Sequence, residues 1–416
     1  MSATARTVQA PGAPARDPAL GYLRSAVAAT PLQALLLLTA LYFLAATAAY
    51  AWVFIGVLGL GLVVFLGAPR WVCYAILGVA LLLLLATFVF QISNGPQDRD
   101  SDRDEAVEIA AQALLDGQNP WARTTQRSTP ITTGPASIIL ALPSVWWFHR
   151  VNELTFVLYI AFFAFLLAGD LRCENDTFLS LGLFFLAGFF DFHHTLYWSL
   201  DELYYAYVAL VLAWIAVRRR WFATAGACLA FAVGSRASYV LPVFGFVCWY
   251  WFSRPASAGA LLVLGCGALV GLLLIVAPFW LVAGRGLPGN NMLGAAWGLL
   301  QTGWPETNPL FRGLDHLRDL IGATAMGALK LAASFAVIWF ASLHLRRLEL
   351  PHPFWHLCLG GFLATVAVYR AGLEGDYVLC FVIPAFMAIA YSSAGRETAT
   401  HATPSPAQIE GRAGRR

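Results

Sequence analysis

The sequence predicts an all-α protein, a polytopic transmembrane helical bundle of about twelve spans with short periplasmic amphipathic helices. Three observations lead to this prediction. Hydrophobic residues make up 59% of the 416 residues and charged residues only 12%, whereas a soluble domain carries about 25% charged residues. The apolar residues form blocks close to the ~20 residues that cross a bilayer. Arginines gather in short segments between these blocks.

The predicted spans follow one another in a single transmembrane domain at 31–393. The flanking segments 1–30 and 394–416 are rich in Ala, Pro and Arg, so both are expected to be disordered. The apolar blocks that define the spans are 31–48, 51–67, 71–92, 151–169, 177–191, 201–217, 221–234, 237–253, 258–283, 319–343, 353–369 and 377–393.

Arginine placement predicts the orientation, because cytoplasmic loops are enriched in Arg and Lys. With a cytoplasmic N-terminus, the basic turn at 218–220 falls inside, and twelve spans return the C-terminus to the same side. The apolar block 135–148 must then be re-entrant or interfacial, because a full crossing would move that turn outside. We therefore expect a multi-pass protein of the plasma (inner) membrane with both termini cytoplasmic. The other arginines placed inside are Arg6, Arg16, Arg24, Arg70, Arg172, Arg254, Arg346 and Arg347.

This orientation leaves two long loops, 93–134 and 284–318, on the outer face, and we expect the active site there. The first loop opens with an acidic stretch and continues into a short amphipathic helix that would lie flat on the membrane. Asp104 stands at its start and Gly117 at its end, as N-cap and C′ residues do. The apolar face of this helix is formed by Val107, Ala110, Ala111, Leu114 and Leu115.

Several classes of function are disfavoured. No basic run resembles a nucleic-acid patch, so nucleic acid is not an expected partner. The seven cysteines show no paired spacing, so we predict neither a disulfide framework nor a metal cluster. No internal repeat of fixed period is visible, which disfavours a transporter built from inverted repeats.

Several different short motifs lie between about residues 90 and 255. The acidic stretch is followed by a helix that ends in Leu-Leu-x-Gly-x-Asn-Pro-Trp at 114–121, and then by a Pro-bounded apolar run at 135–143. Farther on, Asp201 and Glu202 begin a span, Arg236 ends a short one, and Pro242 lies in the next. In these motifs the chain resembles the GT-C superfamily of membrane glycosyltransferases, mannosyltransferases among them, which take sugars from polyprenyl-phosphate donors.

The resemblance implies that an Asp of the first outer loop acts as general base on the acceptor hydroxyl. Asp104 matches that position best, Asp102 and Asp100 are close rivals, and Glu105 is a candidate substrate-binding residue. The alternative is a solvated acidic stretch without chemistry. The chain departs from the pattern at Val107 and its neighbours, where some relatives have a Tyr, and this puts the detailed acceptor contacts in question.

A second polar group, Asp191, His193 and His194, is expected at the outer end of a span. Many members of the superfamily have an acidic site here, and in some it depends on a metal. These side chains are suited to contact sugar hydroxyls or a divalent cation such as Mg²⁺ or Mn²⁺. We assign them to substrate binding and assign no metal ligand, because adjacent His side chains often point apart. The alternative is a set of polar residues at headgroup level.

Arg236 and Arg370 are candidates for binding the donor phosphate. Both are predicted at outer ends of spans, and charge near the membrane is costly and usually functional. A guanidinium holds two phosphate oxygens at once. The alternatives are snorkelling of Arg236 to a lipid headgroup and an internal pair of Arg370 with Glu374.

The function expected from these residues is transfer of a sugar from a polyprenyl-phosphate donor to a glycan, lipid or protein acceptor on the outer (periplasmic) face. Membrane lipids are the further expected partners. Three alternatives stay open. The first is a lipid or solute transporter or flippase, which helix breaks predicted at Pro278 and Pro384 would favour. The second is a non-catalytic membrane scaffold, and the third is an inactive enzyme of the same fold.

Overall fold

The computed structural model describes residues 103–126, 128, 130–149, 202–253, 257–283, 297, 300–301, 312–347 and 353–367. Within these ranges the regular elements are helices, with one isolated β-bridge between Thr124 and Pro130. The described part is therefore all-α, as predicted. Both predicted terminal segments, the spans expected before residue 93 and between 151 and 191, and the last span at 377–393 lie outside it.

The six predicted spans that fall in the described ranges are all helical. Two of these helices, α12 and α15, are long and apolar enough to cross a membrane by length and composition. The other four have only 14 to 17 residues, which gives them a length of roughly 21–26 Å. The count of twelve spans stays a prediction. The helices are α9 (Glu202–Arg218), α10 (Phe222–Ser235), α11 (Val240–Ser253), α12 (Ala258–Ala283), α15 (Ala323–Arg347) and α16 (Pro353–Ala367).

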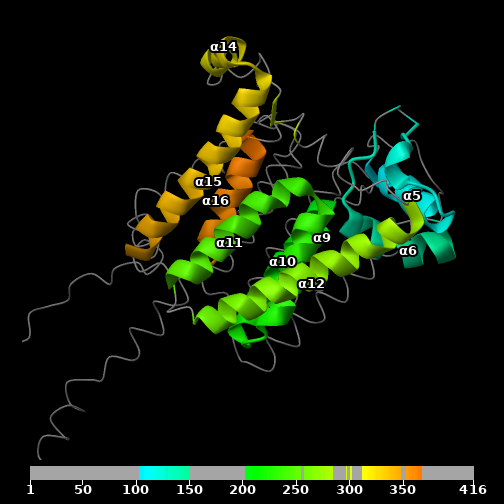
Figure 1. Ribbon diagram of the computed structural model, residues 1–416, viewed down its shortest axis with the longest axis horizontal. Helices are drawn as coiled ribbons and strands as arrows, with labels where there is room; N and C mark the ends of the chain where they lie inside the picture. The colour runs from blue at the N-terminus through cyan, green and yellow to red at the C-terminus, as the bar shows by residue number, and fades with distance from the viewer. Residues whose placement is uncertain are drawn as a thin grey trace, which may run out of the picture.

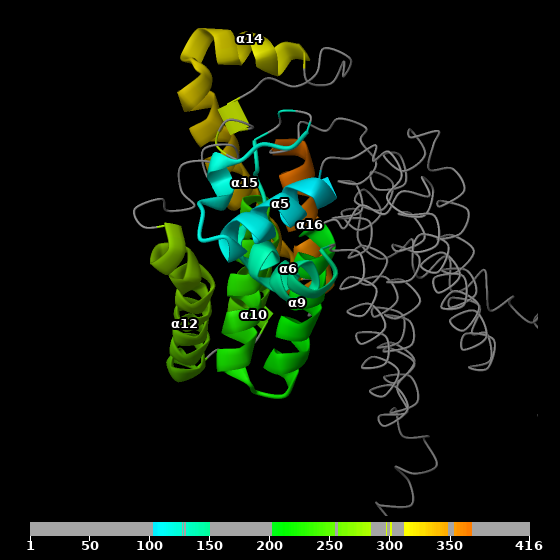
Figure 2. The same ribbon diagram turned by 90° about the vertical axis from the view of Figure 1, so that its right-hand side faces the viewer.

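These helices form two adjoining groups (Figure 1). In the first, α10 packs between α9 and α12; in the second, α11 packs against α15 and α16. The short helix η4 (Ala237–Tyr239) joins α10 to α11 and so connects the groups. Figure 2 shows α9, α10 and α12 running side by side, with α14 (Arg312–Ile321) lying across the end of α15.

Helices α10 and α12 approach each other through small residues. A Cβ placed on Gly226 would lie 2.0 Å from the carbonyl oxygen of Leu264, and one on Gly267 would lie 2.2 Å from that of Ala223. Gly271, four residues after Gly267, meets Ala227 in the same way. Small residues four apart that let two backbones touch are typical of helix pairs in membranes, where apolar side chains gain nothing by leaving lipid.

The second group combines close packing with buried polar contacts. A Cβ on Gly245 of α11 would lie 2.5 Å from the carbonyl oxygen of His356 in α16. The His356 side chain is buried, and its Nδ1 is 2.7 Å from the Ser342 hydroxyl of α15. Because a buried polar group is costly unless it finds a partner, this hydrogen bond fixes how α15 and α16 sit against each other.

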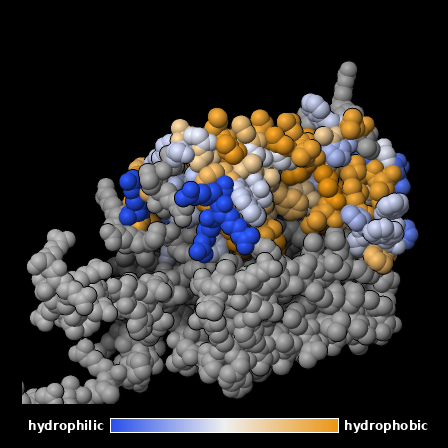
Figure 3. Space-filling model, turned by 90° about the horizontal axis from the view of Figure 1, so that it is seen from below, coloured by the Kyte–Doolittle hydropathy of each residue, from blue (hydrophilic) through white to orange (hydrophobic). Residues whose placement is uncertain are grey.

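Much of the described surface is apolar. Seen from below, apolar side chains cover large areas of the described part (Figure 3). On α12, large side chains point outward around the helix, with Leu281 86% exposed. Monomeric soluble proteins rarely expose such extended apolar surface. The residues of α12 that contribute are Leu262, Val263, Leu269, Val270, Leu272, Leu273, Leu274, Trp280 and Leu281.

Two predictions about element boundaries are wrong. The span predicted at 319–343 begins only at Ala323, because Gly322 (φ 87°) turns the chain and leaves residues 319–321 in α14. The helix break predicted at Pro278 is absent, since α12 continues through it to Ala283. Proline removes one helical hydrogen bond, but the following residue, Phe279, is fully buried and holds this turn in place.

The contact between α10 and α12 predicts that Gly267→Ala lowers the stability of the purified protein by about 1–3 kcal/mol, because the added methyl group must push two backbones apart. Gly265→Ala on the same helix is the control, since nothing lies within 4 Å of its Cβ position. Thermal unfolding in detergent should show a lower Tm for the first variant and an unchanged or higher one for the second. Equal melting temperatures would contradict the close approach.

Candidate functional site

The described parts of the predicted loop 93–134 and of the apolar block that follows it form a cap made of three helices. They are α5 (Arg103–Leu115), η2 (Pro120–Ala122) and α6 (Pro135–Phe148). Helix α5 packs on α6, and α6 packs on α10 and α12. At 14 residues, α6 is about 21 Å long, the same length as α10 and α11; its re-entrant or interfacial placement stays a prediction.

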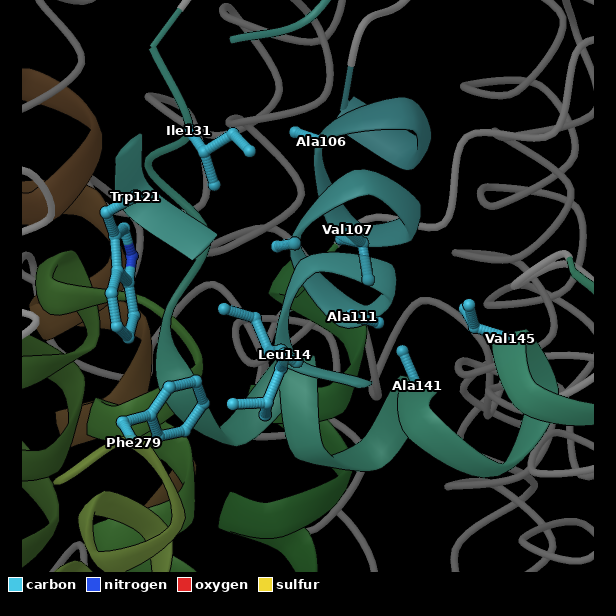
Figure 4. Packing of buried hydrophobic residues seen from close by; sticks show 11 residues of the cluster. Ala106, Val107, Ala111, Leu114, Trp121, Ile131, Ala141, Val145 and Phe279 are labelled. Carbon is cyan, nitrogen blue, oxygen red and sulfur yellow. The ribbon is translucent and has the colours of Figure 1, made fainter. Parts of the chain in front are cut away.

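The apolar face of α5 is used for packing inside the protein. Val107, Ala110 and Ala111 are fully buried, and Leu114 is nearly so. They join α6 and Phe279 of α12 in one core cluster (Figure 4). This face therefore packs inside the protein, and the position of α5 relative to the membrane stays a prediction. The prediction for Leu115 is wrong: it is 42% exposed, because it lies about 80° around the helix from Val107, at the edge of the apolar stripe.

The motif at 114–121 builds a compact helix end. Gly117 has a left-handed backbone (φ 72°), and the amides of Gly117 and Gln118 donate to the carbonyl oxygens of Leu114 and Ala113. These are the two hydrogen bonds of a Schellman helix end, so the predicted C′ role of Gly117 is confirmed. Asn119 then caps η2, accepting a 3.1 Å hydrogen bond from the backbone amide of Trp121.

Trp121 anchors the loop to the bundle. Its ring is buried and faces Phe279 of α12 at a centroid distance of 4.9 Å (Figure 4). Its Nε1 donates a 3.1 Å hydrogen bond to the carbonyl oxygen of Thr133. The motif at 114–121 thus has a folding role: Gly117 and Asn119 shape the helix end, and Trp121 anchors the loop.

The cap meets the bundle most closely where Gly134 touches the end of α10. The Gly134 amide donates a 3.0 Å hydrogen bond to the carbonyl oxygen of Ser235. A Cβ on Gly134 would lie 2.1 Å from the carbonyl oxygen of Gly234, so only glycine fits. Both Gly134 and Ser235 are buried. The contact joins residues about one hundred positions apart in the sequence and fixes the first outer loop on the α10–α11 junction.

Arg236 lies at this junction. It follows Ser235 directly, in an extended conformation (φ −156°, ψ 134°) between α10 and η4, and it is half-buried. The basic turn of Arg218, Arg219 and Arg220 is at the opposite end of α10. There, Arg218 lies over the ring of Trp214 and Arg219 over that of Trp221, each at 5.3 Å. Arg236 therefore lies at the opposite end of α10 from the basic turn that joins α9 to α10.

The acidic candidates are found at the start of α5. Helix α5 begins at Arg103, so Asp104 is its second residue and the predicted N-cap role of Asp104 is wrong. Asp104 and Glu105 both lie in the first turn, where the helix dipole stabilises negative charge. The Glu105 Oε1 accepts a 2.9 Å hydrogen bond from the backbone amide of Gln126, so this carboxylate also holds the loop. Asp102 lies outside the described residues.

The start of α5 belongs to the cap, and Arg236 follows the end of α10 on which the cap packs. Asp191, His193, His194 and Arg370 lie outside the described residues, so their roles stay predictions. Within the described ranges, no group of three His, Cys, Asp or Glu side chains is arranged to hold a metal ion. The sequence interpretation overlooked buried polar side chains in α15 and α16, above all Lys330 and His356; a charged residue within an apolar block was the signal.

No family model, curated protein or solved structure matches this chain. The function must therefore be argued from the residues and their arrangement.

The contact at Gly134 predicts that Gly134→Ala detaches the cap from the bundle, because the backbone has no room for a methyl group. Amide hydrogen exchange over 118–134 should become at least several-fold faster, since local opening would cost less. Gly259→Ala, with nothing within 4 Å of its Cβ position, is the matched control and should leave this exchange unchanged. Unaltered exchange in Gly134→Ala would show that the contact does not hold the loop.

A separate prediction concerns Glu105. Glu105→Ala should speed amide exchange at Gln126 several-fold, because the amide loses its carboxylate acceptor. Glu105→Gln keeps an oxygen at that place and should largely preserve the protection. Gln112→Ala, a change on the exposed side of the same helix, serves as control. If Glu105→Ala leaves Gln126 protected, the carboxylate is not needed for the loop.

Proposed function

We propose that this chain is a multi-pass glycosyltransferase of the plasma membrane that moves a sugar from a polyprenyl-phosphate donor to an acceptor on the outer face. The observation that carries the proposal is the Gly134–Ser235 contact, which fixes the loop bearing Asp104 on the junction bearing Arg236. A carboxylate and a guanidinium are the two groups that this reaction requires. The resemblance of residues 90–255 to the GT-C superfamily supports the same assignment.

The membrane orientation is part of the proposal. The spans α12 and α15, the exposed leucines of α12 and the glycine-mediated helix packing support a lipid environment. The basic turn at 218–220 is assigned to the cytoplasmic face. Because Ser235 lies at the other end of α10, the cap is assigned to the periplasmic face. Twelve spans and cytoplasmic termini complete this assignment.

The proposed reaction is a direct displacement at the anomeric carbon. The Asp104 carboxylate takes the proton of the acceptor hydroxyl as its oxygen attacks. The bond between the sugar and the phosphate oxygen breaks, and the polyprenyl phosphate leaves with both bonding electrons. Arg236 stabilises the departing anion by charge-assisted hydrogen bonds, with Arg370 as its proposed partner. One displacement inverts the anomeric configuration. Asp191, His193 and His194 are assigned to binding the sugar, directly or through a divalent cation.

A lipid or solute transporter is the second candidate, and one observation favours it. Buried Lys330 and His356 lie within apolar helices, and ionisable residues inside the membrane often mark transport pathways. The uninterrupted α12 counts against it, because the break expected at Pro278 is absent.

The test is sugar transfer from a panel of radiolabelled polyprenyl-phosphate sugars to acceptors in membranes that contain the full chain. Asp104→Asn should lower transfer by about 10²–10⁴-fold, because the general base is lost. Arg236→Gln should lower it by about 10- to 100-fold, through loss of a charge-assisted hydrogen bond. Protein levels are compared in every membrane preparation.

Two control variants accompany this test. Asp116→Asn changes an exposed acid just after the other end of α5, and Arg219→Gln changes an arginine in the basic turn; both should transfer sugar as the wild type does. Full activity in Asp104→Asn would remove that residue from the mechanism. Absence of transfer from every donor, combined with flux of a lipid-linked sugar across vesicles, would favour the transporter.

A further inference from the structure

The end of the bundle opposite the cap carries exposed arginines next to an exposed tryptophan. The turn between α9 and α10 presents Arg218, Arg219 and Arg220, and the following Trp221 is 56% exposed. Figure 2 shows this turn on the side of the molecule away from α14. Arginine beside tryptophan is typical of the headgroup region of a membrane, where basic side chains attract anionic lipids and tryptophan lies between the apolar and polar layers.

Arg220 occupies a backbone position that normally favours glycine. Its φ is 62°, its amide donates to the carbonyl oxygen of Val217, and the amide of the next residue donates to that of Ala216. The end of α5 has the same two hydrogen bonds with Gly117 at the equivalent place. A left-handed backbone is unfavourable for a residue with a Cβ, so helix termination alone does not account for an arginine here. Such an outlier points to a role for the side chain.

Two of the guanidinium groups lie over tryptophan rings. That of Arg218 is 5.3 Å from the centre of the Trp214 ring, and that of Arg219 is 5.3 Å from the centre of the Trp221 ring. Each cation is attracted by the ring beneath it, which restricts the arginine side chain. The ring has no net charge, so the guanidinium keeps its positive charge and its N–H donors. The turn therefore presents positive charge in a restricted arrangement.

Helix α11 ends on the same side of the bundle. Tyr250 in its last turn contacts Phe222 at the start of α10, with 5.9 Å between the ring centroids. Its neighbour Trp251 is 52% exposed. A second exposed tryptophan thus lies at the end of the bundle that carries the basic turn.

Helix α15 adds a fourth exposed arginine to this end. It runs parallel to α11, because Phe244 contacts Phe335 and, farther along both helices, Phe252 contacts Trp339. Arg346 is exposed and follows Trp339 by seven residues, which is about 10 Å along the helix. It therefore lies where α11 finishes, on the side of the basic turn.

The helices that carry these arginines contain almost no acidic residues. No Asp or Glu occurs between residues 203 and 283, a range that includes α10, α11, α12 and all of α9 after Glu202. None occurs in α15 either. The charge that these helices contribute at this end is therefore positive, which favours an anionic ligand.

We propose that Arg218, Arg219 and Arg220, together with Arg346, form a binding surface for the headgroups of anionic phospholipids. A guanidinium binds two phosphate oxygens at once, and the net negative charge of such a lipid complements the four arginines. The partner is a lipid and not a free anion, because the exposed tryptophans at this end place the arginines at the boundary between apolar and polar layers. The inference rests on the membrane assignment within the proposed function and is independent of sugar transfer.

The test uses the full chain purified in detergent and three probes: dioleoyl phosphatidylglycerol, dioleoyl phosphatidylcholine and inorganic phosphate. With radiolabelled lipids, the wild type should bind phosphatidylglycerol at least tenfold more tightly than phosphatidylcholine. High salt should reduce this preference, because exposed charges are screened. Equal affinity for the two lipids would overturn the proposal. Displacement of phosphatidylglycerol by equimolar inorganic phosphate would assign the surface to free phosphate and overturn the lipid assignment.

Variants separate a binding role from a structural one. Arg220→Gly should lower the affinity for phosphatidylglycerol roughly fivefold, the loss expected for one basic residue near a membrane surface. Its Tm should stay equal or rise, because glycine suits the left-handed backbone. The triple variant Arg218→Gln, Arg219→Gln, Arg220→Gly should bind both lipids equally. Arg123→Gln, which removes an exposed arginine from the cap, is the matched control and should bind as the wild type does. An unchanged lipid preference in the triple variant would overturn the proposal.

The outcomes distinguish this inference from the proposed function. A lipid preference that depends on the basic turn, without transfer from any sugar donor, supports the binding surface and removes the glycosyltransferase. Sugar transfer by a wild type that binds both lipids equally removes the binding surface and leaves the glycosyltransferase.

Discussion

The backbone contact between Gly134 and Ser235 is the constraint on which the candidate site depends. It fastens the first outer loop to the junction of α10 and α11 through a 3.0 Å hydrogen bond, with no space for a side chain on Gly134. Pro135 starts α6 immediately afterwards, so the direction of α6, and of α5 packed on it, follows from this one contact. Any chemistry shared by the loop and Arg236 requires it to hold.

The local parts of this arrangement could be predicted from the sequence. The end of α5 was predictable because a left-handed glycine and an Asn-Pro pair act over a few residues. The apolar stripe correctly predicted that Val107 and Leu114 are buried. It wrongly included Leu115, which lies at the edge of the stripe, where burial falls off gradually. Apolar blocks gave the helices of the bundle, but a hydrophobic block cannot reveal that Gly322 turns the chain after Ile321, so the start of α15 was misplaced.

The long-range parts could not be predicted. Nothing near Gly134 in the sequence indicates that its partner is Ser235, and nothing near Gly226 indicates Leu264. The break expected at Pro278 assumed that a missing hydrogen bond decides the local structure. In the protein, the buried contact between Phe279 and Trp121 outweighs it, because a packed aromatic pair with its buried area stabilises more than one backbone hydrogen bond. The acidic candidates show a further limit: sequence pattern identified Glu105, but not its hydrogen bond to the Gln126 amide.

Close packing through small residues also means that a polar side chain buried between the helices needs a hydrogen-bond partner there. When α10 and α12 touch by backbone, and α11 and α16 do likewise, the interior has little spare volume, and each polar side chain inside it must have a specific reason. Ser342 and His356 satisfy each other at the end of α15 away from the cap, so hydrogen bonding accounts for them.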